Sequence, residues 1–325
     1  MNSHSPIVPV DKKSIAHAVE LLREGKLVAF PTETVYGLGA DATQGQAVAA
    51  IYAAKGRPEF NPLIAHVAEI EALDPIVEWN DEARLCAKSF WPGPLTLVLP
   101  RRKDCPVSLL ASAGLHTLAV RMPSHPAALQ LLKAFGRPVV APSANASGTL
   151  SPTTAEHVAA SLGSNVDLIL DGGKSEVGVE STVCDLSTSQ PTILRPGGIT
   201  KEQMEAVLGP VTTIGESQGS TDENTPRPSP GMMTSHYAPR LPLRMNAATA
   251  EEHEAFLTFG PGTSTGRAAQ LNLSPKGDLC EAAANLFLML HELDQPRYRG
   301  IAVMPIPNTG LGVAINDRLK RASVR

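Results

Sequence analysis

Short apolar runs alternate with helix-like segments along the first two hundred residues, and this alternation most restricts the folds available to the chain. The segment from Asp11 to Leu22 repeats its apolar residues at helical spacing, and the apolar run 27–30 follows it after Gly25. Such alternation predicts a layered α/β domain, in which helices cover most of a sheet.

The same pattern continues toward the middle of the chain. We expect helices over 47–54, 81–90, 126–135 and 154–162, and strands over 63–67, 95–99, 117–121, 139–141 and 166–170. Two closely spaced strands, over 182–186 and 192–194, predict a mixed sheet and not a purely parallel one.

The composition changes after Gly209. Residues 215–230 are almost all polar, glycine or proline, which predicts a linker. We therefore expect a first domain over 1–210, a linker over 211–240 and a smaller α/β domain over 241–325. The expected elements of the second domain are strands over 241–245, 256–259 and 301–306, a helix over 279–293 and a basic terminal helix from residue 313.

Composition excludes several classes of protein. The 325 residues are 42% hydrophobic with a net charge of −4, which disfavours a chain that mainly coats nucleic acid. The four cysteines are scattered, so neither a disulfide scaffold nor a zinc site is expected. With no secretory signal and no apolar run near the roughly 20 residues of a membrane helix, we expect a cytoplasmic protein without a membrane contact.

Two short motifs carry chemistry suited to a nucleotide. Lys55-Gly56-Arg57 offers two cations at a helix exit, and Ser143-Ala144-Asn145 offers a hydroxyl and an amide in a loop after an apolar run. A triphosphate needs neutralised charge and oriented donors, so together they predict a triphosphate site without a P-loop.

Two further arginines stand where strands are expected to end. Arg121 follows an apolar strand, and Arg195 precedes Pro196 in the same kind of position. Ligands of open α/β sheets gather at the carboxyl ends of strands. The alternative for any lysine or arginine is an ordinary surface charge, but this repeated placement favours anion binding.

Other motifs have simpler interpretations. The glycines of 37–42 match a dinucleotide fingerprint weakly and those of 173–175 match a P-loop weakly, and we interpret both sets as tight turns. Ser143 lacks the setting of a hydrolase nucleophile. His66 could be a hydrogen-bonded core histidine and His236 an exposed loop residue, and no histidine spacing supports a metal site.

Taken in order along the chain, these segments resemble the YrdC-like threonylcarbamoyl-adenylate synthases in their long, two-domain form. The resemblance rests on 30–39, 55–67, 91–96, 118–123, 141–148, 168–173, 178–186, 194–199, 229–232, 236–239, 310–312 and 314–318. It implies a twisted mixed sheet with helices around a concave cationic cavity, and a small Rossmann-like α/β C-terminal domain.

The resemblance also implies a reaction. ATP, L-threonine and bicarbonate would give threonylcarbamoyl-AMP and pyrophosphate, with Mg²⁺ entering on the ATP and no metal ligands from the protein. A separate transferase would use the product to modify the adenosine beside the anticodon of tRNA. Direct contact between this chain and tRNA stays open, as does its oligomeric state.

Site residues follow from the resemblance, position by position. The catalytic, phosphate-binding set is Lys55, Arg57, Ser143 and Asn145. The L-threonine-binding set is Thr34, His66, Arg121, Ala141 (through its backbone) and Ser181. The ATP-binding set is Arg57, Asn61, Thr117, Ser143, Ser151, Arg195 and Tyr237.

The linker is expected to take part in the site. Ser229-Pro230-Gly231-Met232 and His236-Tyr237-Ala238-Pro239 combine prolines with an aromatic side chain, which favours ordered structure. We hypothesise that the linker folds over the nucleotide as a lid and excludes water from a mixed anhydride that hydrolyses easily.

Two alternative functions remain. An RNA-binding module could use the same cationic face, although the acidic net charge and the 4% aromatic content count against it. The second is a carbamoyl-adenylate enzyme of hydrogenase maturation, but such enzymes carry acylphosphatase and zinc-finger parts that this sequence lacks.

Overall fold

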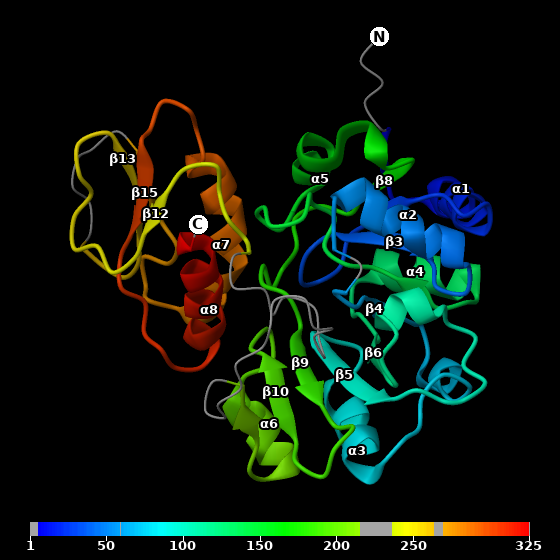
Figure 1. Cartoon of the computed structure of the whole chain (residues 1–325). Coiled ribbons are helices and arrows are strands. Elements are labelled where there is room, and N and C mark those ends of the chain that lie inside the picture. The colour runs from blue at the N-terminus through cyan, green and yellow to red at the C-terminus, as the bar shows by residue number, and fades with distance from the viewer. Residues whose placement is uncertain (1–5, 59, 215–235, 263–268, 325) are drawn as a thin grey trace.

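The computed structural model describes residues 6–58, 60–214, 236–262 and 269–324. They form a large α/β unit with an eleven-stranded sheet and a smaller unit with a four-stranded sheet, shown side by side in Figure 1. The predicted α/β class with a second, smaller α/β domain is confirmed.

The large sheet is mixed, as the closely spaced strands predict. Its strands are β1 (Ile7–Pro9), β2 (Val28–Phe30), β3 (Gly37–Asp41), β4 (Ile64–His66), β5 (Leu95–Pro100), β6 (Thr117–Arg121), β7 (Val139–Val140), β8 (Leu168–Asp171), β9 (Thr182–Asp185), β10 (Thr192–Arg195) and β11 (Thr212–Thr213). They lie in the order β1-β8-β2-β3-β7-β4-β6-β5-β9-β10-β11. The sheet contains both parallel pairs, such as β4 with β6, and antiparallel pairs, such as β5 with β6.

Helices cover the two faces of this sheet unequally. They are α1 (Lys12–Arg23), α2 (Gly45–Lys55), α3 (Asp81–Phe90), α4 (Pro126–Phe135), α5 (Ala155–Leu162) and α6 (Lys201–Leu208), with short 3-10 turns at Ile70–Leu73, Leu109–Ser112 and Gly163–Asn165. Helices α1 and α4 share one core with β2 and β8, whereas α2, α3, α5 and α6 contribute to the main core.

Helices α1 and α4 pack on one face of the sheet over β2 and β8, but they do not extend over the strands from β4 to β10. There a small separate cluster holds Ile64, Ala119 and their neighbours. Side chains alternate between the faces of a strand with a period of two, so His66 and Arg121 lie on the same face as Ile64 and Ala119. This face carries the candidate site.

The smaller unit consists of β12 (Leu243–Arg244), β13 (Glu254–Thr258), β14 (Gln270–Asn272), β15 (Gly300–Val303), α7 (Leu279–Leu293) and α8 (Leu311–Ser323). Its sheet is wholly parallel, in the order β12-β15-β13-β14, as expected of a Rossmann-like unit. Helices α7 and α8 lie on the side that faces the large unit (Figure 1).

Within the described ranges, no helix combines the length and the apolar character needed to cross a bilayer.

One interpretation of the glycines was wrong. Gly37 and Gly39 do not form a tight turn; they lie in β3, which pairs antiparallel with β2. A Cβ on Gly39 would approach Phe30 Cε1 to 2.8 Å, so glycine is needed here for close packing across the strands. Gly173, by contrast, has a φ of +82°, as a turn requires.

Several elements were not predicted: β1, β3, β11, β14 and α6. Strand β11 falls within the predicted linker but pairs in parallel with β10. The segment 229–232, expected to be ordered, lies outside the described residues. Residues 236 and 237 at the other end of the linker are described and buried.

Candidate functional site

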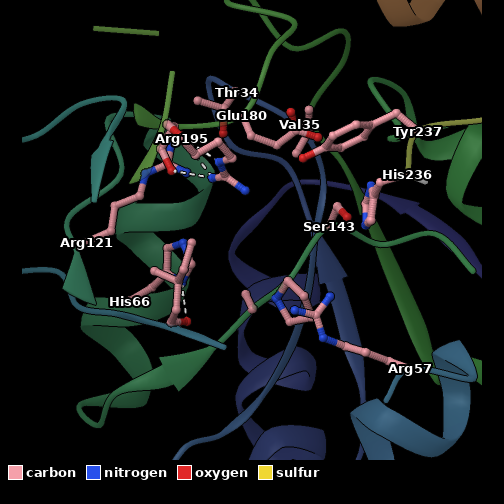
Figure 2. A pocket seen from close by; sticks show the side chains of 14 residues that line it. Thr34, Val35, Arg57, His66, Arg121, Ser143, Glu180, Arg195, His236 and Tyr237 are labelled. Carbon is pink, nitrogen blue, oxygen red and sulfur yellow. Dashed lines mark hydrogen bonds between the residues drawn. The ribbon is translucent and has the colours of Figure 1, made fainter. Parts of the chain in front are cut away.

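A cavity opens at the carboxyl ends of β4 and β6, and Figure 2 shows the side chains that line it. His66 and Arg121 end these two parallel strands and are direct cross-strand partners. In the close-up they lie on one side of the cavity, with His236 and Tyr237 on the other. Arg121 and Arg195 lie at the ends of strands, as the sequence predicts.

Arg121 is held by an acidic partner. Its Nη2 donates to Glu33 Oε1 at 2.5 Å and its Nε donates to the Gly93 carbonyl at 3.3 Å. The other oxygen of Glu33 accepts from the backbone N–H of Ser124 at 3.1 Å. The guanidinium is only 4% exposed, so its orientation is fixed.

His66 is a hydrogen-bonded core histidine that also belongs to the cavity wall. It is buried, its Nδ1 lies 3.0 Å from the carbonyl oxygen of Ile64, and it also lines the cavity. Burial, helped by the charge of Arg121, lowers the pKa of His66 to about 3. The imidazole is therefore neutral at physiological pH and adds no further charge to the cavity.

Lys55 joins the two sequence motifs. It ends α2, and Gly56 follows in the left-handed conformation with a φ of 59°. The Lys55 ammonium donates to the carbonyl of Ser143 at 2.5 Å and to the carbonyl of Asn145. The predicted proximity of the motifs is confirmed, and the surface-charge alternative is wrong because Lys55 is 4% exposed.

Arg57 is also buried and also lacks a described acidic partner. Its Nη2 donates to the Pro62 carbonyl at 3.0 Å and its Nε to the Asn61 carbonyl at 3.3 Å. Burial lowers the pKa of Arg57 to about 10, and burial together with the charge of Arg57 lowers the pKa of Lys55 well below its usual value. An anion bound between these groups would favour their charged forms.

Arg195 reaches the cavity from β10. Its Nη2 donates to the carbonyl of Ser181 at 3.0 Å and to the Ser181 hydroxyl at 3.1 Å. The same hydroxyl lies 2.7 Å from Thr96 Oγ1. Because β9 and β10 run antiparallel, Ser181, which precedes β9, lies beside Arg195, which ends β10.

Several buried polar atoms have no hydrogen-bond partner among the described residues. They include both polar atoms of the Asn61 side chain, Oδ1 of Asn145 and Nδ1 of His236. Buried polar groups are nearly always paired, so such a concentration beside the cations is typical of a site shaped for a polar ligand.

The end of the linker closes the opposite wall. Tyr237 is 1% exposed and packs on Phe287 of α7, with ring centroids 5.7 Å apart. His236 is 5% exposed, so the interpretation of an exposed loop histidine was wrong. Burial, together with the charge of Arg57, lowers the pKa of His236 to about 3.

The remaining predicted residues are placed as follows. Thr34, Ala141, Ser143 and Ser181 line the cavity, and the Ala141 N–H is used by the Ile64 carbonyl. Ser151 is buried and donates to Glu180. Thr117 begins the strand that Arg121 ends, about 13 Å away at the rise of an extended chain, and it does not line the cavity.

Sequence reasoning missed three charged groups at or near the site. Glu33 and Glu180 lie in the segments 30–39 and 178–186 that carry the family resemblance, but no nearby sequence pattern identified the arginines with which they pair. The third, Arg318 in α8, forms an ion pair with Glu180 at 2.7 Å. The described residues contain no group of three or more His, Cys, Asp or Glu side chains that could hold a metal.

Comparisons with known proteins identify relatives of this chain. Residues 20–197 match a family model described as "Telomere recombination", and residues 199–324 match "Threonylcarbamoyl-AMP synthase, C-terminal domain". A threonylcarbamoyl-AMP synthase of Bacillus subtilis is 44% identical over 95% of this chain and 92% of that protein. One of Pyrococcus abyssi is 41% identical over 97% of this chain and 95% of that protein.

A solved structure extends the comparison to three dimensions. The crystal structure of P. abyssi Sua5 complexed with L-threonine superposes with a TM-score of 0.90 at 40% identity, over 98% of both chains.

Proposed function

We propose, from the premise that the chain belongs to the threonylcarbamoyl-AMP synthase family, that it makes threonylcarbamoyl-AMP and pyrophosphate from L-threonine, bicarbonate and ATP. The observation that carries the proposal is the convergence of two anion sites in one cavity. His66 and Arg121 lie on one wall, and Arg57 with Ser143 lies beside them.

The threonine end would be organised by Arg121. A guanidinium fork matches a carboxylate bidentately, and the orientation of this one is fixed by Glu33 and Gly93. The P. abyssi Sua5 structure, which superposes on this fold with a TM-score of 0.90, was solved with L-threonine. Neutral His66 beside Arg121 can exchange hydrogen bonds with the substrate without repelling its ammonium group.

The phosphate end would be organised by Lys55, Arg57, Ser143 and Asn145. The substrate ammonium group loses a proton, and bicarbonate takes up a proton and releases water to give CO₂. The free amine attacks CO₂ and loses a second proton to give a carbamate, and a carbamate oxygen then attacks the α-phosphorus of ATP. The bond between the α-phosphorus and its bridging oxygen breaks, and pyrophosphate leaves with that electron pair. The buried cations neutralise the crowded charge, so positioning and electrostatic stabilisation supply the catalysis.

Magnesium is expected to enter with the nucleotide. Glu180, the acidic side chain among the described residues that line the cavity, is already engaged by Ser151 and Arg318. The ion would therefore be held by phosphate and water oxygens, a mode that suits Mg²⁺. The protein's part would be to place the cations around the metal-bound triphosphate.

The product would be used by a separate transferase that modifies the adenosine beside the anticodon of tRNA, as the family implies. The buried position of Tyr237 supports the hypothesis that the linker excludes water from the labile anhydride.

The test is to incubate the protein with ATP, magnesium, bicarbonate and L-threonine while following pyrophosphate and the adenylate mass. Controls omit threonine or replace it with serine. Threonine- and bicarbonate-dependent pyrophosphate with the threonylcarbamoyl-adenylate mass is the expected result. ATP binding without any adenylate would overturn the proposal and favour the RNA-binding alternative.

A further inference from the structure

Glu180 has an unexpected position for an acidic side chain. It is 6% exposed and lines a cavity whose other charged side chains include Arg57, Arg121 and Arg195. An unneutralised carboxylate here would repel a triphosphate and a threonine carboxylate alike. Its charge must therefore be compensated before the cavity can receive an anion.

The compensation comes from the second domain. Arg318 of α8 is 1% exposed, and its Nε donates to Glu180 Oε2 at 2.7 Å. Its Nη1 donates to the Pro196 carbonyl of the first domain at 2.9 Å. The Ser151 hydroxyl donates to the other Glu180 oxygen, so both oxygens are held.

The same arginine touches the wall made by the linker. Its guanidinium carbon lies 5.1 Å from the ring centroid of Tyr237. Burial alone would raise the pKa of Glu180, but the charges of Arg318 and Arg195 outweigh it and hold that pKa below its usual value. Glu180 is thus an anion with its charge balanced.

A second contact fixes the backbone beside Glu180. Gly178 has a φ of +72°, and a Cβ there would lie 2.4 Å from the carbonyl oxygen of Ala283 in α7. The loop before Glu180 is therefore packed directly against the backbone of the second domain. Ser181, the next residue, holds Arg195 through its carbonyl and hydroxyl.

We propose that Arg318 is a positioning residue through which the docked second domain completes the nucleotide side of the cavity. It neutralises and orients Glu180, and Glu180 with its loop places Ser151, Ser181 and thereby Arg195. The expected kinetic effect rests on the proposed function. The buried charge of Arg318 supports a positioning role, because a domain that only covered the site would need no buried charge at this point.

The decisive comparison uses Arg318→Met, the double variant Arg318→Met/Glu180→Gln and the conservative Arg318→Lys. Loss of the arginine alone leaves an uncompensated carboxylate beside the triphosphate, so we expect the ATP Kd and KM to rise at least about tenfold. Removing both charges should restore the ATP Kd and KM to within about threefold of the wild-type values. The values for Arg318→Lys should lie between those of wild type and Arg318→Met.

Lys174→Met provides the matched control. Lys174 Nζ donates to Asn285 Oδ1 of α7 at 2.8 Å, a contact between the domains on the exposed surface. This variant should leave ATP binding and turnover unchanged. Circular dichroism and thermal unfolding establish that each variant is folded, and the double variant and Arg318→Lys decide the matter if Arg318→Met does not fold.

Calorimetric ATP binding is measured beside pyrophosphate release, so that the two proposals can fail separately. A wild type that binds ATP but forms no adenylate would defeat the proposed function alone. Equal ATP affinity in wild type and folded Arg318→Met, or a double variant as weak as the single one, would overturn the positioning role.

Discussion

Two groups of buried cations in this molecule differ in what holds them. Lys55, Arg57 and Arg195 donate mainly to backbone carbonyls, and we call them the carbonyl-held cations. Arg121 and Arg318 instead form ion pairs with Glu33 and Glu180, and we call them the carboxylate-paired arginines.

The pKa values of the three carbonyl-held cations and of Arg318 follow this difference. Burial lowers the pKa of Lys55, Arg57 and Arg195, because carbonyl dipoles compensate a charge only in part. Burial also disfavours the charge of Arg318, but the groups around it, led by Tyr237 and Glu180, outweigh burial and raise its pKa. Carbonyl-held cations are thus typical of an anion site, whereas the carboxylate-paired arginines are already compensated by their glutamates and have fixed orientations.

The variant Lys55→Met, in a carbonyl-held cation, should give the largest effect on activity and so tests the difference between the two groups most strongly. Under the proposed function Lys55 is a charged donor at the phosphate end, and the loss of one such donor costs about 10²–10³ in rate, so we expect kcat/KM to fall by about that factor. The free energy of unfolding should change little. The variant loses two hydrogen bonds to carbonyls, but it no longer has to bury a charged ammonium group, which is unfavourable. Pyrophosphate release and thermal unfolding measure the two effects. A large loss of stability with activity retained would contradict the assignment.

Glu33→Gln would convert a carboxylate-paired arginine into a carbonyl-held one. Breaking a buried ion pair leaves Arg121 uncompensated, so we expect about 3 kcal/mol less stability, or a thermal midpoint lower by roughly 6–12 °C. The KM for threonine should fall, because Arg121 then has no competing carboxylate. A higher threonine KM at unchanged stability would show that Glu33 acts on the substrate directly.

Tyr237 lies between the two groups, with its ring on Arg318 and its hydroxyl close enough to Arg195 to oppose, in part, the lowering of that residue's pKa by burial. Tyr237→Ala should raise the ATP KM about tenfold, in keeping with the loss of a buried aromatic wall, and release free AMP through hydrolysis. Tyr237→Phe is the matched control and should keep the adenylate intact. Unchanged kinetics in the alanine variant would eliminate the lid hypothesis.

The smallest effect concerns a neutral contact between the domains. His157 of α5 and His291 of α7 stack with centroids 3.9 Å apart, and His291 Nε2 lies 3.1 Å from the Ser151 carbonyl. Burial, followed by the neighbouring imidazole, lowers the pKa of His157 to about 4, and burial also lowers that of His291.

Since the unfolded chain binds protons near pH 6.5 and the folded pair does not, stability is full above that pH. It should fall as the pH drops from about 6.5 toward 4. His157→Gln should make the decline of the thermal midpoint in this window shallower than in wild type. Parallel declines in the two proteins would show that the pair does not titrate as described.

Much of the fold could be predicted because its signals are local. Helices α3, α4 and α7 and strand β6 have the predicted bounds, since capping residues and apolar spacing act within a few residues of one another. Strand β1, of three residues, was missed because its partner β8 is far away in the sequence, and β14, also of three residues, is too short to show a pattern of its own. Gly39 was misread as a turn because its need for glycine comes from Phe30 on the adjacent strand.

The sequence by itself determined which cations gather at the candidate site, because ligand-facing helix exits and strand ends lie at the same edge of an open α/β sheet. Lys55, Arg121 and Arg195 were identified in this way. Tertiary structure alone decided how each charge is compensated. The pairing of Glu180 with Arg318 joins residues 138 positions apart, and only the docking of α8 brings them within 2.7 Å. Electrostatic compensation depends on distance in space, and no local pattern of residues specifies that distance.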